Sequence, residues 1–471
     1  MADKQDYDLV IIGSGPGGYV AAVRAAQLGL RTACVEKAPR LGGVCLNEGC
    51  IPSKALLDSS EYYHLALTHL ADHGVKTGKV GLDLKTMMAR KDKVVEDLTT
   101  NVRKLLESHK VTLLEGTASV PEPGQVTVAA AKGKKKQTLT TRHILLATGS
   151  APVEPPGLDF DGDRIVNSTD ALRFEAVPKH LGIVGGGYIG LELGSVWLRL
   201  GAKVTVIEML PKIGTGLDGQ VARTLDRILR KQGFDMRLGT RVMEAKASAK
   251  GVSVTVEKDE QRESLTFDRL LVSVGRRPLT RNLGLEALGV KTDTKSGHIL
   301  VDEGYQTSVA GIYAIGDLVP GPMLAHKASA EGIAAVESIA GRHGEVNYDA
   351  IPSVIYTWPE VASVGLTEDQ VKAREIPYCV GSYPFTGAGR ARCMGETDGF
   401  VKLIAHGKTD RILGVHIIGP RAADMIAECV LALEFGASSE DIARTVHGHP
   451  TFAEALQEAA MAVRKCSIYA S

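Results

Sequence analysis

The chain has 471 residues, 44% of them hydrophobic, which is more than one domain usually holds and enough to bury several cores. Its 55 basic residues balance 55 acidic ones, so net charge gives no argument for nucleic acid or an anionic membrane as a partner. The N-terminus is polar and the apolar stretch after it is interrupted by glycine and proline, which predicts neither a signal peptide nor a membrane span. We expect a cytoplasmic enzyme that acts on small molecules.

The first segment with a distinct pattern runs from Tyr7 to Glu36. An apolar strand leads through a glycine-rich turn into an alanine-rich helix, and a second strand ends at Glu36. In such a turn, one glycine permits the tight bend, another lets the backbone approach a pyrophosphate, and a third lets the helix pack on the strand. The helix N-terminus then offers N–H groups and a positive dipole end to the phosphates. The pattern predicts a dinucleotide-binding βαβ unit whose turn glycines are Gly13, Gly15 and Gly18.

Two cysteines, Cys45 and Cys50, follow directly after this unit. Seven cysteines at scattered spacing in a large chain are not the disulfide framework of a small secreted protein, so a close pair suggests catalysis. In an ideal helix, Cα atoms at this spacing lie roughly 8 to 9 Å apart, beyond the roughly 7 Å that a disulfide tolerates. We therefore expect a distorted backbone, which Gly49 and Pro52 make plausible. Zinc is the alternative to a redox disulfide, but no second Cys/His pair at ligand spacing accompanies this one, and we expect no metal.

The segment from His180 to Glu208 repeats the first pattern. Its acid, Glu208, follows Gly185 at the same 23-residue spacing that separates Glu36 from Gly13. A carboxylate at the end of the second strand accepts both ribose hydroxyls and repels a 2′-phosphate, so Glu208 favours NAD over NADP. The repeat predicts a second nucleotide-binding unit, whose turn glycines are Gly185, Gly187 and Gly190.

Several motifs together resemble the pyridine nucleotide–disulfide oxidoreductase family over nearly the whole chain. The two cysteines lie in a Gly-Gly-x-Cys-x-x-x-x-Cys-x-Pro-Ser-Lys pattern that ends at Lys54. The other family marks are Ala147-Thr148-Gly149, Gly275-Arg276-Arg277-Pro278, Tyr-Ala-Ile-Gly-Asp ending at Asp317, and His447-Gly448-His449-Pro450-Thr451 followed by Glu454. The resemblance implies an α/β fold with two Rossmann-like domains, for FAD and NAD, and a C-terminal α+β dimerisation domain.

The resemblance also implies domain boundaries and cofactor contacts. The expected domains are FAD-binding (1–150), NAD-binding (151–280), central and returning to FAD (281–346), and dimerisation (347–471). Each subunit is expected to hold one FAD tightly and without a covalent bond, and to bind NAD. The implied FAD-side residues are Gly13, Gly15, Gly18, Glu36 on the adenosine ribose, Lys54 beside the flavin, Gly116, Gly149, Asp317 on the ribityl chain, Met323, Leu324, Ala325 and His326. The implied NAD-side residues are Gly185, Gly187, Tyr188 as a gate, Gly190, Glu208, Val242 and Gly275, with Glu192 as the partner of Lys54.

The C-terminal motif supplies acid–base chemistry in this interpretation. Thiol–disulfide exchange proceeds through the thiolate, so a base is required. His449 precedes Pro450, which we expect to be a first helical residue, and Glu454 lies about one turn further on, where its carboxylate could fix the imidazole tautomer. The resemblance implies that His449, rather than His447, reaches the Cys45–Cys50 pair of the other subunit of a homodimer. The catalytic residues are then Cys45, Cys50, His449 and Glu454.

The substrate is inferred from the stretch between Ile51 and His64. It resembles the family members that oxidise protein-bound dihydrolipoyl groups with NAD+, and its apolar residues suit a long apolar chain. Such members serve the acyltransferase core of 2-oxo-acid dehydrogenase complexes or the lipoyl carrier of the glycine cleavage system, and we expect no nucleic-acid or membrane partner. The alternatives are a glutathione-reductase-like NAD(P)H-dependent enzyme, an NADH oxidase with a single thiol, and a non-catalytic structural subunit.

Overall fold

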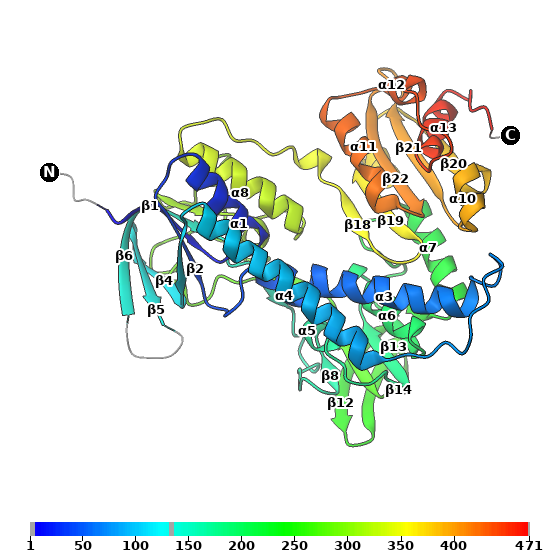
Figure 1. The fold of residues 1–471 in the computed structure, drawn as a ribbon, viewed down its shortest axis with the longest axis horizontal. Helices are drawn as coiled ribbons and strands as arrows, with labels where there is room; N and C mark the ends of the chain where they lie inside the picture. Colours follow the sequence, from blue (N-terminus) through cyan, green and yellow to red (C-terminus); the bar gives the residue numbers. More distant parts are fainter. Residues whose placement is uncertain (1–4, 131–135, 470–471) are drawn as a thin grey trace. The chain divides into compact units, whose positions relative to one another are not determined.

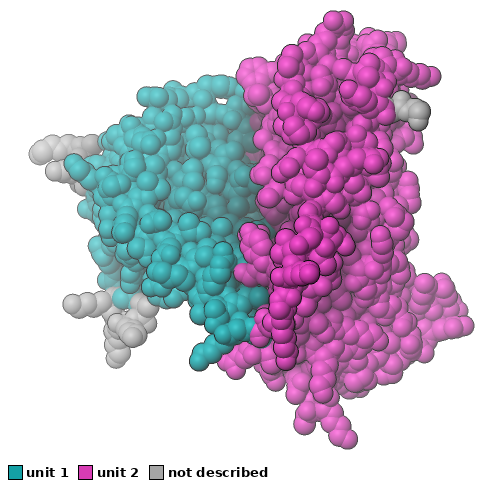
Figure 2. Space-filling model, turned by 45° about the vertical axis from the view of Figure 1, so that its right-hand side comes forward, with its two compact units in different colours: residues 1–56, 83–153, 275–346 teal, residues 57–82, 154–274, 347–471 magenta. Residues whose placement is uncertain are grey.

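The computed structural model describes residues 5–130 and 136–469. The chain forms two compact units, coloured separately in Figure 2. The first unit comprises residues 1–56, 83–153 and 275–346, and the second comprises residues 57–82, 154–274 and 347–471. The predicted division into four domains cuts the chain more finely and stays a prediction. No helix in the described part of the chain combines the length and apolar character that a membrane span needs.

The first unit is built on the predicted strand–turn–helix–strand segment. Strand β1 (Tyr7–Ile12) pairs in parallel with β2 (Thr32–Glu36), and helix α1 (Pro16–Gln27) connects them. Both strands are largely buried because helices and loops cover both faces of a parallel sheet. Figure 1 shows α1 beside α8 (Ala325–Ile339). Two glycines permit this approach, since a Cβ on Gly332 would lie 2.7 Å from the carbonyl oxygen of Gly17.

Strand β6 (Lys136–Leu146) connects the parallel and the antiparallel part of a seven-stranded sheet of order β3-β2-β1-β6-β5-β4, to which β17 also pairs. Its C-terminal half pairs in parallel with β1, and its first residues pair in antiparallel fashion with β5 (Gln125–Ala129). Strand β17 (Ile312–Ala314) adds to β6 in parallel and brings the motif that ends at Asp317 to the first nucleotide unit. The remaining elements of this unit are β3 (Thr112–Glu115), β4 (Thr117–Glu122), β7 (Ser150–Pro152), β16 (Arg276–Pro278), α2 (Gly43–Glu48), α4 (Leu84–Ser108), the short η1 (Gly316–Leu318) and the start of α3 (Cys50–Thr68).

The second unit contains the repeat of the βαβ segment. Strands β9 (His180–Val184) and β10 (Lys203–Glu208) pair in parallel, with α6 (Tyr188–Arg199) between them. The five-stranded sheet has the order β11-β10-β9-β15-β8, and an antiparallel meander, β12-β13-β14, is inserted in the sequence between β11 and β15. The other elements are β8 (Ile165–Val166), α5 (Ser168–Ala171), α7 (Gly219–Gln232), β11 (Asp235–Leu238), β12 (Arg241–Ser248), β13 (Gly251–Lys258), β14 (Gln261–Phe267) and β15 (Arg269–Val272).

The C-terminal part of the second unit is an antiparallel sheet of order β18-β19-β22-β21-β20. Helix α11 packs on β19 and β22, and α13 packs on β20 and β21 (Figure 1). With the two nucleotide segments, this sheet confirms the predicted fold class. The bounds are η2 (Tyr348–Ala350), β18 (Ser353–Ile355), β19 (Glu360–Gly365), α9 (Glu368–Ala373), β20 (Tyr378–Pro384), η3 (Phe385–Gly387), α10 (Gly389–Met394), β21 (Phe400–His406), β22 (Ile412–Gly419), α11 (Ala422–Glu434), α12 (Ser439–Arg444) and α13 (Glu454–Val463).

A buried lysine joins these two parts of the second unit. Lys402 on β21 donates from Nζ to both carboxylate oxygens of Asp218, at 3.0 and 2.9 Å, and to Glu368 Oε2 at 2.7 Å. Asp218 also caps α7, because its Oδ1 accepts the N–H of Gln220 at 3.0 Å. The side chains of Lys402 and Asp218 are 2% and 1% exposed. The network therefore ties the nucleotide segment to the C-terminal sheet.

This network predicts the acid sensitivity of the fold. Hydrogen bonds from Lys372 and then from Lys402 lower the pKa of Glu368 to about 2 from an ordinary 4.5. A carboxylate whose folded-state pKa is depressed stabilises the fold fully above its ordinary pKa, and this contribution is lost as the pH falls toward 2. We expect Lys402→Met to lower the free energy of unfolding at neutral pH by about 3–5 kcal/mol, because Asp218 keeps its buried charge without a partner.

Urea unfolding of Lys402→Met at a series of pH values would measure both effects. The loss should shrink as the pH approaches 2, where the carboxylates become protonated. The matched control is Lys408→Met, which removes an exposed lysine from the same segment and should leave the unfolding midpoint unchanged. Equal stability of Lys402→Met and the wild type at neutral pH would show that the network is not stabilising.

Candidate active site

The first glycine turn has the conformation that a nucleotide-binding turn requires. Gly13 has φ +104°, and a Cβ there would lie 2.3 Å from the carbonyl oxygen of Ala147. A Cβ on Gly18 would lie 1.9 Å from the carbonyl oxygen of Gly13. At Gly15, in contrast, the nearest atom is 4.0 Å away. Contacts within the protein therefore require glycine at Gly13 and Gly18. Gly15 instead leaves room for a ligand at the N-terminus of α1.

The second turn reproduces this geometry. Gly185 also has φ +104°, and a Cβ there would lie 2.6 Å from Ser273 O. A Cβ on Gly190 would lie 2.6 Å from Gly185 O, whereas Gly187 has nothing within 4 Å. Neither helix N-terminus has a side-chain cap, so backbone N–H groups remain there for phosphate oxygens. The predicted repeat is thus confirmed as a structural repeat, and the nucleotide contacts of its residues stay predictions.

Each glycine turn is hydrogen-bonded to the acidic residue at the end of the second strand of its βαβ unit. Glu36 Oε2 accepts the N–H of Ser14 at 2.9 Å and its hydroxyl at 2.7 Å, and Oε1 accepts the N–H of Ala38 at 2.9 Å. Glu208 Oε2 accepts the N–H of Gly186 at 2.6 Å, and Oε1 accepts that of Leu210 at 2.8 Å. The backbone therefore holds both carboxylates beside the glycine turns, as ribose recognition would require. The hydroxyl of Ser14 was not anticipated from the sequence.

The Asp317 carboxylate is held by a relay within the first unit. Ser150 donates from Oγ to Asp317 Oδ2, and the same Oγ accepts a hydrogen bond from Arg276 Nε at 2.7 Å. Arg276 also donates from a terminal nitrogen to the carbonyl of Ser150 at 2.7 Å. Among the described residues, no donor contacts Asp317 Oδ1, so that oxygen can accept from a ligand. Ser150 and Arg276 lie in or next to predicted motifs, but spacing alone did not reveal their link.

The other predicted FAD-side positions lie around the same sheet. Gly116 donates its N–H to the carbonyl of Glu36 at 2.9 Å. Gly149 has φ +72° and, like Gly275 at φ +129°, has no atom within 4 Å of the position of a Cβ. The segment from Met323 to His326 leads into α8, whose cap residue Leu324 makes no side-chain cap. Open space at Gly15 and Gly149 and an accepting oxygen on Asp317 fit a bound dinucleotide, and these residues would hold it.

The two cysteines flank a break between helices. Helix α2 ends at Glu48, Gly49 adopts φ −141° and ψ −111°, and α3 begins at Cys50. The predicted backbone distortion at Gly49 is confirmed, and Pro52 lies in the first turn of α3, where a missing N–H costs nothing. Neither residue is in a disulfide in the structure; Cys45 is partly buried and Cys50 is exposed.

Charge and hydrogen bonding set the state of the Cys45 thiol. A hydrogen bond with the Cys50 thiol and then burial raise the pKa of Cys45 well above its ordinary value, and the positive charge of Lys54 and the N–H of Cys50 offset this rise only in part. Lys54 lies one helical turn after Cys50 on α3. The predicted lysine is therefore close enough to favour a thiolate on Cys45. Its predicted pairing with Glu192, which belongs to the second unit, stays a prediction.

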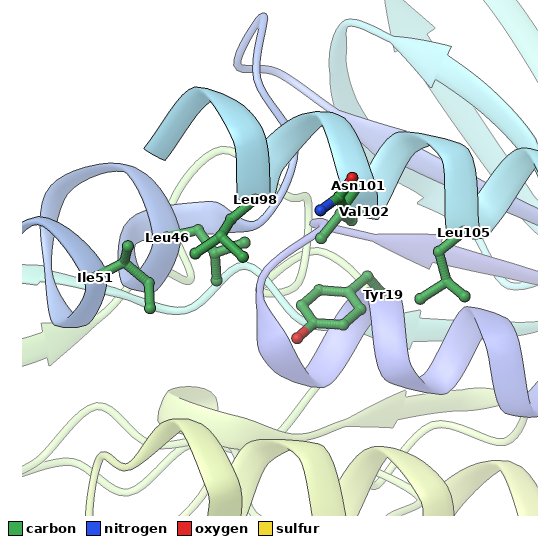
Figure 3. Close-up of a pocket in the computed structure, with 7 residues that line it drawn as sticks. All are labelled: Tyr19, Leu46, Ile51, Leu98, Asn101, Val102 and Leu105. Carbon is green, nitrogen blue, oxygen red and sulfur yellow. The ribbon is translucent and has the colours of Figure 1, made fainter. Parts of the chain in front are cut away.

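An apolar pocket of about 430 Å³ lies next to the cysteine pair. Figure 3 shows side chains from α1, α2, α3 and α4 around it. Its lining consists of Tyr19, Leu46, Ile51, Leu98, Asn101, Val102 and Leu105. Burial and then the Cys45 charge raise the pKa of Tyr19. Two lining residues, Leu46 and Ile51, directly follow Cys45 and Cys50 in the chain. The residues from α4 were not predicted from the sequence, although their spacing of 98, 101, 102 and 105 is that of one helix face.

The predicted base and its partner contact each other in the second unit. His449 Nδ1 and Glu454 Oε1 are 2.7 Å apart, and the histidine side chain is 81% exposed. Glu454 is partly buried, which opposes ionisation, but hydrogen bonds from His449 and from the N–H of Thr451 lower its pKa. His447 is different, because its two ring nitrogens lie 2.8 Å from Thr445 O and 2.8 Å from Glu428 Oε1. Of these two histidines, His449 is therefore the one whose imidazole is exposed to solvent.

The expectation that Pro450 begins a helix is wrong. Helix α13 begins at Glu454, and the peptide bond between His449 and Pro450 is cis. Glu454 Oε2 accepts the N–H of Thr451 at 2.8 Å. This hydrogen bond links the first residue of α13 to the turn before it, so the helix begins four residues after the proline.

Of the other predicted NAD-side residues, Tyr188, Glu192 and Val242 lie in the second unit, whereas Gly275 falls in the first. Tyr188 is the first residue of α6 and is 41% exposed, and Val242 lies on β12. Glu192 on α6 is buried, and its Oε1 accepts the N–H of Tyr356 at 3.0 Å. The flavin-side residues and the cysteines thus belong to the first unit. The second unit contains Tyr188, Glu192, Val242 and His449. No group of three or more potential metal ligands occurs among the described residues.

Comparison with known proteins finds matches over nearly the whole chain. The family described as pyridine nucleotide-disulphide oxidoreductase matches residues 7–332, and its dimerisation domain matches residues 351–460. Dihydrolipoyl dehydrogenase 2, mitochondrial, from Arabidopsis thaliana is 50% identical over 461 residues, 98% of this chain and 90% of the relative. The mitochondrial dihydrolipoyl dehydrogenase of Bos taurus is 49% identical over 462 residues, 97% of this chain and 90% of the relative. Leghemoglobin reductase of Glycine max is 49% identical over 461 residues, 98% of this chain and 88% of the relative.

Solved structures show the same architecture. LpdA from Mycobacterium tuberculosis superimposes with a TM-score of 0.88 at 25% identity, covering 96% of this chain and 99% of that chain. The HOCl-induced flavoprotein disulfide reductase RclA from Escherichia coli, determined as a Cu(II) complex, has a TM-score of 0.85 at 27% identity, covering 97% and 99%.

Proposed function

Because this chain belongs to the pyridine nucleotide-disulphide oxidoreductase family, as its motifs predicted, we propose that it oxidises protein-bound dihydrolipoyl groups with NAD+. Relatives named dihydrolipoyl dehydrogenase are about half identical over nearly its full length. The observation that carries the proposal is a cysteine pair at a helix break beside an apolar pocket. A thiol-bearing apolar chain could reach Cys45 through such a pocket.

The chemistry of the chain's own residues begins with a proton. His449 takes it from one thiol of the dihydrolipoyl group, and the resulting thiolate attacks Cys45 Sγ of the oxidised Cys45–Cys50 pair. The protein S–S bond breaks, and Cys50 leaves as a thiolate. The second substrate thiol then displaces Cys45 from the mixed disulfide, so that lipoyl is released and the protein pair carries two more electrons. When bound, FAD and NAD+ supply the two-electron acceptors that reoxidise this pair.

Glu454 and Lys54 support these steps electrostatically. Glu454 stays ionised at neutral pH because its pKa is lowered, so the His449 ring keeps a negative partner when it gains the proton. Lys54 favours the thiolate form of Cys45. The first glycine turn with Glu36 and Asp317 would hold FAD, and the second with Glu208 would hold NAD. Glu208 favours NAD over NADP in this proposal, because it would repel a 2′-phosphate.

The pocket predicts how the substrate chain is recognised. Leu98 and Leu105 on α4 and Ile51 on α3 present apolar surface to this pocket (Figure 3). We expect Leu98→Trp to fill this space and to raise the KM for dihydrolipoamide about tenfold, the scale of a lost apolar contact. Steady-state NADH formation at varied dihydrolipoamide would measure it. The control Leu300→Trp enlarges an exposed leucine outside the lining and should leave KM unchanged. An unchanged KM for Leu98→Trp would place the substrate elsewhere.

The dimerisation domain and the family indicate a homodimer, and we propose that His449 of one subunit serves the cysteine pair of the other. The lipoyl-bearing partners would belong to 2-oxo-acid dehydrogenase complexes, through their acyltransferase core, or to the glycine cleavage system. The predicted cytoplasmic location stays a prediction, since the plant and animal relatives above are named mitochondrial.

One assay tests the substrate assignment. The visible spectrum of the purified protein is recorded first, and then NADH formation from dihydrolipoamide and NAD+ is compared with NADPH consumption by oxidised glutathione. Flavin absorbance with activity on the first pair supports the proposal. Activity on the second pair alone would favour a glutathione-reductase-like enzyme and overturn the reading of Glu208. NADH oxidation by oxygen, without thiol turnover, would favour the oxidase alternative.

A further inference from the structure

An ion pair with no solvent exposure lies under the turn that carries Asp317. Lys327 Nζ and Glu331 Oε1 are 2.9 Å apart, one helical turn from each other on α8, and both side chains are 0% exposed. A buried charge is costly unless it is paired and hydrogen-bonded, so the location of this pair requires a reason. The mechanism proposed above uses neither residue.

The pair holds both polar groups of one residue, Gly316. The carboxylate Oε2 of Glu331 accepts the N–H of Gly316 at 2.7 Å, and Lys327 Nζ donates to the carbonyl of Gly316 at 3.0 Å. These two groups belong to successive peptide units, so the pair fixes the backbone on both sides of the residue. Gly316 has φ +69°, and a Cβ there would lie 3.1 Å from Cβ of Ala328, the residue after Lys327.

The next residue along the chain is Asp317. Its own preceding peptide carries the carbonyl that Lys327 holds, and its carboxylate is oriented from the other side by Ser150. The same ion pair lies in the first two turns of α8, which begins directly after the Met323–Leu324 segment expected to contact the flavin. One buried pair therefore connects the turn of Asp317 to the start of α8.

We propose that Lys327 and Glu331 are positioning residues for FAD, which fix the Asp317 turn against the N-terminus of α8 so that both meet the flavin. This inference rests on the proposed function, because it requires FAD at the first nucleotide unit. Neither side chain touches the cofactor in this proposal. They act on FAD binding indirectly, by fixing the backbone of Gly316 and so the position of the Asp317 carboxylate.

The test uses the holoenzyme of Glu331→Gln, which preserves shape but leaves Lys327 without a counter-charge, and of Lys327→Met, which leaves the Gly316 carbonyl without its donor. FAD release after dilution is followed by the rise in flavin fluorescence, well below the unfolding midpoint of each variant. We expect both variants to release FAD at least about tenfold faster than the wild type, with an altered visible flavin band. Release within about twofold of the wild type, with an unchanged band, would overturn the proposal.

A matched control separates positioning from stability. Lys402→Met also breaks a buried lysine–carboxylate pair, but in the second unit, and should lower the unfolding midpoint without changing FAD release. If Lys402→Met released FAD as fast as the Lys327 and Glu331 variants do, general destabilisation would explain the faster release and the inference would be wrong.

The double variant K327M/E331Q removes both buried charges and carries the test if a single variant does not fold. Its stability should recover relative to the single variants, because no unpaired charge remains. FAD release should stay fast, because the Gly316 carbonyl still has no donor; slow release would contradict the proposal. A wild-type protein that contains no flavin would instead defeat the proposed function itself.

Discussion

Replacing Cys45 by serine is expected to abolish the oxidation of dihydrolipoamide, lowering kcat by more than about a thousandfold, as loss of a catalytic nucleophile does. A serine oxygen cannot take part in a disulfide, so neither the protein S–S bond nor the mixed disulfide with substrate can form. FAD should remain bound, because the substitution exchanges one side-chain atom of Cys45 and leaves the residues that would hold the cofactor unchanged. Steady-state NADH formation, together with the flavin spectrum, measures both expectations.

The matched control for this variant is Cys379→Ser. Cys379 is an exposed free cysteine on β20, in the second unit, and no part of the proposed mechanism uses it. Its variant should retain full activity and the same flavin content. If Cys45→Ser kept a tenth or more of wild-type turnover, the pair could not be the route of electrons from the thiol substrate.

The second large effect is expected for His449→Gln. Positioned general acid–base groups contribute about 10²–10⁴ in rate, and we expect kcat for dihydrolipoamide oxidation to fall within this range. Glutamine occupies similar space but cannot accept a proton at neutral pH. Turnover of this variant should rise with pH, because hydroxide then generates the substrate thiolate without the imidazole. A pH series of initial rates would detect this change in profile.

The control for His449→Gln is His343→Gln. His343 lies 3.1 Å from Glu345 and is likewise highly exposed, so it reproduces a histidine–glutamate pair outside the candidate site. Its removal should change neither kcat nor the pH profile. If His449→Gln kept the wild-type pH dependence of kcat, another group would be the base that takes the substrate proton.

Mixed dimers test whether the site is shared between subunits. A dimer of one Cys45→Ser subunit and one His449→Gln subunit combines two inactive parents. If each site takes its cysteines from one subunit and its histidine from the other, one of the two sites is intact and activity returns. Purified mixed dimers without activity would place both groups within one subunit.

The two glycine turns could be predicted from the sequence because local rules determine them. Steric contact requires glycine at Gly13 and Gly18, and again at Gly185 and Gly190. The pattern can therefore be recognised from a few neighbouring residues. The break at Gly49 followed in the same way from the reach of a disulfide. Such predictions need only a few neighbouring residues and the geometry of the backbone.

The features that escaped prediction depend on long-range contacts or competing local signals. The pocket combines Tyr19 of α1 with Leu98 of α4, and nothing in either segment alone indicates that they meet. Ser150 joins Arg276 to Asp317 across more than a hundred residues. The start of α13 was misassigned because the signal of Pro450 was weighed without the hydrogen bond between Thr451 and Glu454. The motifs therefore predicted the reactive residues, whereas the pocket and the hydrogen bonds around them depend on tertiary packing.

The bonds between each glycine turn and its acid have a consequence for turnover. Glu208 already holds the N–H groups of Gly186 and Leu210, so the second turn has its shape before any coenzyme arrives. A rigid receptor loses little conformational freedom when it binds, and it need not reorganise when it releases. The first turn is preformed in the same way by Glu36. Each turn can therefore receive its nucleotide without an ordering cost, and the difference between a cofactor that stays and a coenzyme that leaves in every cycle must come from contacts beyond the two turns.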